Sequence, residues 1–341
     1  TSSRRKTQNS DFPSEDVDQI NYKNSDAESQ NLIVITINSE TNENKLLFCY
    51  YTNWAKYRTG GFEFNDKDIA NLCTHIIYAF CNIDANNLTP ISNDPWSDLP
   101  EGIFVKNIVG KYNDYHRITS LKSLNPNLKV LLSVGGYQRL LNEFSIVSSS
   151  ESNAEIFARN TKNFLKKHNF DGFDIDWEYP QNQKQAYNRL LKAMSTEFRK
   201  GPKTYMLTAA VSAGVSKIQA SYEIKEISKL SICNLTIRYL DYINLMTYDF
   251  YGQFSTTVGH HSGLYGISDT DTLNIDYVVR YWAENGAPKS KMIIGSPIYG
   301  QGFKTATKNP KIGDRIVGGT PAGSITQQSG ILAYIEVLSI L

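Results

Sequence analysis

Short apolar runs and longer amphipathic segments alternate along the chain from residue 46 onward. Seven runs rich in β-branched and aromatic residues predict strands at 46–52, 74–80, 129–134, 172–177, 205–212, 241–248 and 291–299. Between them, polar segments with apolar residues at helical spacing predict helices, among them 153–168, 185–200 and 274–286. This alternation indicates an α/β protein with a parallel sheet covered by helices. Seven such units, with no GxGxxG after the first strand, favour a (β/α)8 TIM barrel over a doubly wound sheet.

Residues 1–44 differ in composition from the rest of the chain. They hold four Lys and Arg against eight Asp and Glu, with many Ser and Asn residues and few aromatic ones. Such a composition is typical of a disordered linker. The stretch NLIVITI at 31–37 is the exception, because its apolar character indicates either a short strand or a sticky patch. We assign this stretch no function and place the barrel domain at 45–341.

The fourth predicted strand carries an unusual number of carboxylates, in the stretch FDGFDIDWEYP at 170–180. Side chains alternate along a strand, so Asp174, Asp176 and Glu178 share one face. The other face carries the apolar residues Phe173, Ile175 and Trp177. In a barrel the apolar set packs against helices and the acidic set points inward. Asp171 has the other parity, and we expect it to shape the strand entrance.

Three carboxylates on one strand face cannot all ionise comfortably. Successive residues on a face lie roughly 6–7 Å apart, so burial in a barrel should raise the pKa of at least one of them. Glu178 lies nearest the C-terminal end of the strand, which is the catalytic face of such barrels. A protonated acid there, beside an ionised neighbour, suits glycosidic cleavage. The alternative is a structural ion-pair network, which we disfavour because the strand and its immediate flanks offer no Lys or Arg.

DGFDIDWEYP resembles the DxxDxDxE signature of family-18 glycoside hydrolases, the chitinases and chitinase-like lectins. Further stretches match that family in the same order and lie on predicted strands or at their exits. They are CYYTNWAKYR (49–58), LCTHIIYAF (72–80), SVGG (133–136), LTAAVSAG (207–214), MTYDF (246–250) and SGILAYIEV (329–337). The resemblance therefore extends from about residue 46 to 337.

The resemblance implies a role for each residue that matches the family motif. Glu178 would protonate the glycosidic oxygen, and Asp176 would orient the substrate's N-acetyl group and stabilise an oxazolinium ion. Asp174 would share a proton with Asp176, and Tyr248 would hydrogen-bond the acetamido carbonyl. Because the acetamide itself attacks the anomeric carbon, the product retains its configuration. The implied activity is a retaining endo-chitinase that hydrolyses β-1,4-linked N-acetylglucosamine polymers.

Strand parity and the same resemblance predict a set of substrate-binding residues. Inward aromatic side chains would stack on sugar faces, with core packing as the alternative for any one of them. The glycines of SVGG would let the backbone approach a sugar, unless they form a plain tight turn. The predicted set comprises Tyr50, Trp54, Phe80, Trp96 in a loop, Gly135, Gly136, Tyr137, Met246, Asp249 and Gln301.

The sequence departs from the family pattern at four places. Tyr137 and Phe254 stand where members usually carry Trp, and Gln301 stands where an Arg is usual. These changes remove an N–H donor and a guanidinium group from the cleft. In addition, no segment matches the eighth strand, and 300–341 resembles only the start of the α+β insertion after the seventh. We therefore expect a fragment or a truncated isoform whose barrel has two open edges and an apolar slot.

The four cysteines are too few for a disulfide scaffold. Cys49 and Cys73 match a family disulfide between the first two strands, with buried free thiols as the alternative. Cys81 and Cys233 have no clear partner. NLT sequons at Asn87 and Asn234 are candidate glycosylation sites. Together with the disulfide, they favour secretion. The resemblance implies chitin or chito-oligosaccharides as partners, and we expect a monomer.

Charge and composition give no sign of several other partners. Lys and Arg total 35 against 34 Asp and Glu, so neither nucleic acid nor a membrane surface is expected. No run approaches the length of a membrane span. No His/Cys cluster has zinc spacing, and the adjacent pair His260 and His261 predicts a polar surface loop. We expect neither a metal nor another cofactor.

Three functional hypotheses follow. An intact acid at Glu178 favours the chitinase, because non-catalytic chitinase-like lectins usually lack that Glu. Gln301 and the missing strand leave open a chitin-binding lectin or allergen-type protein. An inactive truncated isoform is the third.

Overall fold

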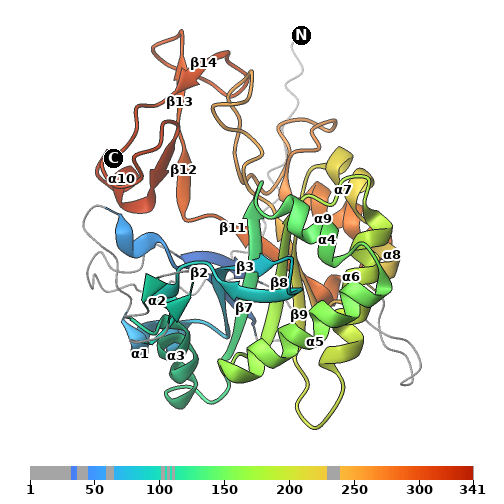
Figure 1. Cartoon of the computed structure of the whole chain (residues 1–341). Coiled ribbons are helices and arrows are strands. Elements are labelled where there is room, and N and C mark those ends of the chain that lie inside the picture. The colour runs from blue at the N-terminus through green and yellow to red at the C-terminus, as the bar shows by residue number, and fades with distance from the viewer. Residues whose placement is uncertain are drawn as a thin grey trace, which may run out of the picture.

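A computed structural model describes residues 45–58, 65–100, 112–228 and 239–340, and the backbone of short strands at 32–36, 104–105 and 108–109. All seven predicted strands are present and parallel, and they form most of one curved sheet with the helices outside it (Figure 1). In sheet order they are β2 (Leu47–Thr52), β3 (His75–Asp84), β7 (Lys129–Tyr137), β8 (Gly172–Glu178), β9 (Met206–Ser212), β10 (Tyr242–Met246) and β11 (Met292–Ser296). The predicted (β/α)8 architecture is confirmed.

The gap between the first and last parallel strands is bridged by β1 (Leu32–Thr36). This strand pairs antiparallel with both β2 and β11, so that Val34 lies opposite Cys49 on one side and Ser296 on the other. NLIVITI therefore contains a strand. The expectation of two open barrel edges is wrong, because β1 offers its backbone N–H and C=O groups to both of them. An eighth parallel strand does not occur among the described residues.

The helices follow the predicted alternation. They are α1 (Asp66–Leu72), α2 (Pro95–Asp98), α3 (Asp114–Ser120), α4 (Leu141–Val147), α5 (Glu151–Lys167), α6 (Lys184–Phe198), α7 (Val215–Ser221), α8 (Ile224–Ile227) and α9 (Ile275–Glu284). Helix α5 illustrates why: Ser150 caps its first turn by accepting from the Asn153 N–H, and Lys166 and Lys167 lie in its last turn. Its buried residues recur at helical spacing and face the sheet.

The outward face of β8 packs under these helices as parity predicts. Phe173, Ile175 and Trp177 are at most 1% exposed. The Trp177 ring stacks on Phe144 of α4 at 4.9 Å between centroids. Burial of these large apolar side chains, at about 2 kcal/mol or more each, fixes the strand so that its alternate residues must point inward.

Beyond β11 the chain leaves the barrel and forms a small projection, red in Figure 1. It consists of β12 (Tyr299–Gln301) paired with β15 (Ile331–Ala333), β13 (Phe303–Thr305) paired with β14 (Ile316–Gly319), and α10 (Tyr334–Leu338). Glu336, 6% exposed, holds it together by accepting from the backbone N–H groups of Ile325 and Ala333. These short elements occupy the region 300–341 predicted to begin an insertion.

Smaller elements complete the sheet and its loops. Strand β4 (Thr89–Ser92) pairs antiparallel with the end of β3, and β5 (Phe104–Val105) pairs with β6 (Ile108–Val109). Three short 3₁₀ turns are η1 (Ala55–Tyr57), η2 (Leu121–Ser123) and η3 (Lys289–Lys291).

The predicted disulfide between Cys49 and Cys73 is present, with a Cα–Cα distance of 6.1 Å. Cys73 lies at the end of α1, just before β3, so the bond joins β2 to that helix end rather than to the strand itself. Cys81 is a buried free thiol. Cys233 and Asn234 lie outside the described residues, so their predicted roles stay predictions.

Candidate active site

Asp174 is the most deeply buried of the three inward carboxylates, with no exposed surface. Four side chains donate hydrogen bonds to it, from β2, β7, β9 and β10. The donors are Tyr50 (3.1 Å), Ser133 (2.7 Å), Thr208 and Asn244 (3.3 Å). Burial raises the pKa of Asp174, and these hydrogen bonds oppose the rise. The barrel interior thus holds this carboxyl in one orientation.

Asp176 follows on the same face and has a different environment. It is 5% exposed, and its Oδ1 has no hydrogen-bond partner among the described residues. Burial, then the charges of Glu178 and Asp174, raise its pKa well above the ordinary value. A buried acceptor without a donor costs free energy. A ligand N–H group that reached Oδ1 would remove that cost.

Glu178 is half-buried at the C-terminal end of β8. Burial raises its pKa to about 7, and the charge of Asp249 adds to the rise. A hydrogen bond with Tyr179 and the charge of Lys217 act in the opposite direction. Near neutral pH this carboxyl is therefore poised between its acid and base forms.

Tyr248 and Asp249 follow β10 and face the same carboxylates. The phenol of Tyr248 lies in the field of Asp176 and Glu178, which adds to the effect of burial in raising its pKa. Asp249 accepts from Tyr299 Oη at 2.8 Å and from Gln301 Nε2 at 2.7 Å. The predicted residues Asp249 and Gln301 are thus brought together with Glu178 at one rim.

A sequence model described as glycosyl hydrolases family 18 matches residues 46–341. The chain belongs to this family. Chitotriosidase-1 of Mus musculus is 34% identical over 313 residues, which cover 86% of this chain and 61% of that protein. The chain thus spans about three fifths of the length of this curated relative.

Solved family-18 structures share the fold. Catalytic domain 2 of the group II chitinase of Ostrinia furnacalis superposes with a TM-score of 0.72 at 34% identity, covering 85% of this chain and 74% of that one. Human YKL-39, described as a pseudo-chitinase with retained chitooligosaccharide binding properties, gives 0.72 at 32% identity, covering 86% and 78%. Catalytic and non-catalytic members therefore both resemble this chain.

The predicted aromatic residues separate into two groups within this family-18 barrel. Trp54 is 39% exposed and stacks on Phe80, with ring centroids 5.8 Å apart, so it presents a ring face at the rim. Tyr50 is only 6% exposed, and its hydroxyl donates to Asp174 and accepts from Asn244 at 2.8 Å. The hydroxyl thus holds Asp174 in place, and the predicted contact of Tyr50 with a sugar stays a prediction.

Trp96 lies on the short helix α2 rather than in a loop, which corrects the prediction. Its ring stacks on Tyr57 at 5.9 Å and meets the edge of Tyr112 at 4.6 Å. Tyr57 and Tyr112 are 53% and 44% exposed. These three rings form a partly exposed group, named here the aromatic shelf. Sequence reasoning missed Tyr57 as a member, although it lies in the matched stretch CYYTNWAKYR.

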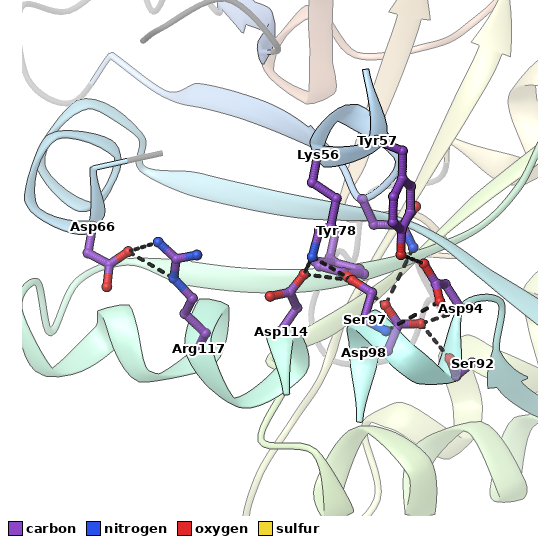
Figure 2. A network of polar contacts seen from close by, with 11 residues as sticks. Lys56, Tyr57, Asp66, Tyr78, Ser92, Asp94, Ser97, Asp98, Asp114 and Arg117 are labelled. Carbon is purple, nitrogen blue, oxygen red and sulfur yellow. Dashed lines mark hydrogen bonds and ion pairs between the residues drawn. The ribbon is translucent and has the colours of Figure 1, made fainter. Parts of the chain in front are cut away.

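A buried polar network anchors the helix that carries Trp96 (Figure 2). At its centre Asp98, fully buried, accepts from Tyr78 at 2.6 Å and from Ser92. Burial raises the pKa of Asp98 to about 6, against the effect of these donors. Ser97 on the same helix accepts from Lys56 at 2.6 Å and donates to Asp114 at 2.8 Å. These contacts tie α2 to β3, η1 and α3, so the shelf rests on a fixed base.

The two glycines of SVGG lie in β7 with left-handed backbone angles. A Cβ at Gly135 would lie 2.0 Å from the Asp176 carbonyl oxygen, and one at Gly136 would lie 2.9 Å from the Phe80 ring. Glycine at these two positions thus lets the Asp176 backbone and the Phe80 ring pack closely against β7. Their predicted approach to a sugar stays a prediction.

Two further predicted residues lie at the ends of strands. Tyr137, 68% exposed, lies opposite Glu178 in the β7–β8 register. Met246 is half-buried at the end of β10, opposite Ser212. Each therefore lies at the carboxyl end of its strand, and its predicted role in binding substrate stays a prediction.

Several residues that support the site carried little signal in the sequence. Ser133, Thr208 and Asn244 are polar residues in otherwise apolar strands, and that contrast was the available signal for donors inside the barrel. Tyr299 and His261 gave none, because their approach to Asp249 depends on the path of β12 and of the loop after β10. Within the described ranges, no group of three or more metal-ligating side chains occurs, and no helix is long and apolar enough to cross a membrane.

Proposed function

We propose that this chain is a retaining endo-chitinase. The observation that carries the proposal is the pairing of Glu178, whose pKa is raised to about 7, with Asp176, whose Oδ1 is buried and unpartnered among the described residues. An acid that still holds its proton near neutral pH, beside an acceptor that needs an N–H donor, matches an N-acetylated sugar. The family-18 relatives, among them chitinases, support this substrate class.

The proposed reaction begins with proton donation from Glu178 to the glycosidic oxygen as its bond to the anomeric carbon breaks. The acetamido oxygen of the substrate attacks that carbon from the other side. Asp176 accepts from the acetamido N–H through Oδ1, and its charge stabilises the oxazolinium ion. The Tyr248 hydroxyl donates to the acetamido carbonyl and orients it.

In the second half of the reaction, water attacks the anomeric carbon, the bond from that carbon to the acetamido oxygen breaks, and the Glu178 carboxylate takes the proton of the water. Two displacements at one carbon retain its configuration. Asp174, held by four donors, shares a proton with Asp176 and supports the change of charge beside it. No second carboxylate is needed as nucleophile.

A chitin-binding lectin is the second candidate. The neutral Gln301 at the rim and the likeness to the pseudo-chitinase YKL-39 support it. In this case the aromatic shelf and Trp54 would hold a sugar chain without cleavage.

Glycosylation and secretion complete the proposal. Asn87 is exposed in the turn between β3 and β4, where a glycan would meet solvent. The disulfide between Cys49 and Cys73 is consistent with an oxidising compartment. We place the protein outside the cell as a monomer.

Hydrolysis of chitotetraose by wild type and Glu178→Gln tests the main proposal, with binding measured on the same samples by calorimetry. We expect the substitution to lower the rate about 10²- to 10⁴-fold and to leave binding nearly intact. Binding without turnover in the wild type would establish the lectin instead. Equal turnover in both proteins would remove Glu178 from the mechanism.

A further inference from the structure

The carboxylate of Asp98, which has no exposed surface, accepts hydrogen bonds on both of its oxygens (Figure 2). Besides the hydroxyls of Tyr78 and Ser92 described above, it accepts from Asn53 Nδ2 at 3.4 Å and from the Asp94 N–H at 3.3 Å. Asn53 directly follows β2 and is 2% exposed, and Asp94 is the N-cap of α2. All four donors are neutral. One side chain thus joins β3 to the ends of β2 and β4 and to both ends of α2.

Each ring of the aromatic shelf is fixed by contacts with this network. The Tyr57 hydroxyl donates to the carboxylate of Asp94, which also caps α2. The Tyr112 N–H donates to the Trp96 carbonyl at 3.2 Å, and the Lys56 ammonium lies 5.1 Å from the centroid of the Tyr112 ring. Trp96 lies within α2 itself. The position of all three rings therefore depends on the position of α2.

A series of contacts connects the shelf with the strand end that carries Glu178. The Phe80 ring lies against Gly136, which precedes the residue of β7 that pairs with Glu178. Trp54 stacks on Phe80, and its carbonyl accepts from the Tyr57 N–H at 3.1 Å. A sugar chain that reaches both the acid and the shelf has to span these rings, whereas a short one bound at the acid does not.

We propose that Asp98 is a positioning residue that sets the affinity of the protein for long chito-oligosaccharides by holding the shelf rings in place. A ring that is already fixed loses little conformational freedom when a sugar stacks on it, so a fixed shelf binds more tightly than a loose one. Asp98 is buried and acts through Trp96 rather than by touching a sugar. The inference rests on the substrate class of the proposed function but not on cleavage.

The first test measures the shelf without any sugar. Asp98→Asn leaves one acceptor oxygen where the carboxylate has two, so it cannot accept from all four donors. We expect this change to loosen α2 and to increase the quenching of Trp96 fluorescence by acrylamide, measured in a Trp54→Phe background. The remaining tryptophans, Trp177 and Trp282, are at most 1% exposed, so the quenching reports Trp96. Unchanged quenching would overturn the proposal.

The second test measures affinity for chitotriose and chitohexaose by calorimetry, in a Glu178→Gln background that prevents cleavage. We expect Asp98→Asn to weaken binding of chitohexaose about tenfold and to leave binding of chitotriose nearly unchanged. Asp66→Asn is the matched control, because it breaks a partly exposed ion pair with Arg117 that joins α1 to α3 (Figure 2). It should change neither affinity. A merely structural role of Asp98 would weaken both sugars alike and would contradict the proposal.

Trp96→Ala completes a double-mutant cycle with Asp98→Asn. If Asp98 acts through Trp96, the double variant binds chitohexaose no more weakly than Trp96→Ala alone. Losses that add would overturn the proposal. If Asp98→Asn fails to fold, Tyr78→Phe takes its place in every comparison, since it deletes one donor to the same carboxylate and keeps the ring.

Failure of this inference and failure of the proposed function give different results. Turnover of chitotetraose by the wild type, together with equal chitohexaose affinity with and without Asp98→Asn, would overturn the inference alone. A wild type without turnover, but with the expected dependence on chain length, would support the inference and contradict the chitinase. A wild type that binds neither sugar would overturn both.

Discussion

The two ends of β8 carry the same kind of side chain in opposite electrostatic settings. At the entrance, Asp171 is paired with Lys122 at 2.9 Å and with Lys203 at 3.3 Å, and it accepts from the Val130 N–H. At the exit, Asp176 and Glu178 have no cation at ion-pair distance in the described part of the chain. Asp171 at the entrance joins neighbouring strands and loops. Asp176 and Glu178 at the exit have raised pKa values and can therefore take part in proton transfer.

Asp174 lies between the two ends and shows a third solution. Its charge is met by four neutral donors rather than by a lysine, so it is buried without being an ion pair. The role of each carboxylate on this strand therefore depends on its partners more than on its residue type. A carboxylate in ion pairs is structural, one with several donors is a support, and one with neither an ion pair nor several donors is a candidate for catalysis.

Among the substitutions that test this comparison, Asp176→Asn should have the largest effect on kcat. An amide lacks the charge that would stabilise an oxazolinium ion, and we expect kcat to fall about 10²- to 10³-fold. Steady-state kinetics on chitotetraose at pH 6 measures it. A loss below tenfold would argue that Oδ1 has no role toward the substrate.

The next effect concerns stability and pH. The folded pKa of Glu178 is raised from 4.5 to about 7, so the folded state binds the proton more tightly than the unfolded state. Its contribution to stability is present below pH 4.5 and is lost as the pH rises through about 7. Relative to Glu178→Gln, the unfolding free energy of the wild type should fall by roughly 1–3 kcal/mol across this window. Urea denaturation at a series of pH values checks it, and a constant difference from pH 4 to pH 8 would contradict it.

Removing one donor from Asp174 should have a smaller effect. Thr208→Val keeps the shape of the side chain but deletes the hydroxyl that bonds Asp174. We expect a loss of about 1–2 kcal/mol and a further rise in the pKa of Asp174. Thermal unfolding measures the first. An unchanged melting temperature would mean that the remaining donors suffice.

The smallest effect should come from Asp171→Asn at the entrance. The ion pairs with Lys122 and Lys203 are partly exposed to solvent, so the loss should be about 1 kcal/mol or less. It should shrink further at high salt, and turnover of chitotetraose should not change. A drop in kcat would show that the two ends of β8 do not act separately.

The sequence predicted the faces of β8 well, because strand alternation is local geometry. The role of Asp171 at the strand entrance and the inward set ending at Glu178 both follow from parity alone. The lysines that pair with Asp171 were missed because Lys122 and Lys203 are 49 and 32 positions away from it along the chain. Only the fold brings them to the strand.

Three other features depended on tertiary contacts in the same way. The pairing of β1 with both β2 and β11 requires the path of the N-terminal segment, which its composition does not specify. Tyr50 has the inward parity expected of a sugar contact, but its hydrogen bond to Asp174 could not be predicted from parity. The sequence predicts that His261 lies at the surface, and only the path of the loop after β10 brings it to Asp249. Periodicity thus predicts the face of a residue but not its depth or its partner.

The central claim is that Glu178 is a protonated acid at the open end of β8. The pH profile of kcat/KM on chitotetraose tests it most directly, measured for wild type and Glu178→Gln. We predict an alkaline limb near pH 7 in the wild type and a rate lower by at least about 10²-fold at every pH in the variant. A wild-type limb below pH 5, or a variant with wild-type turnover, would contradict the account.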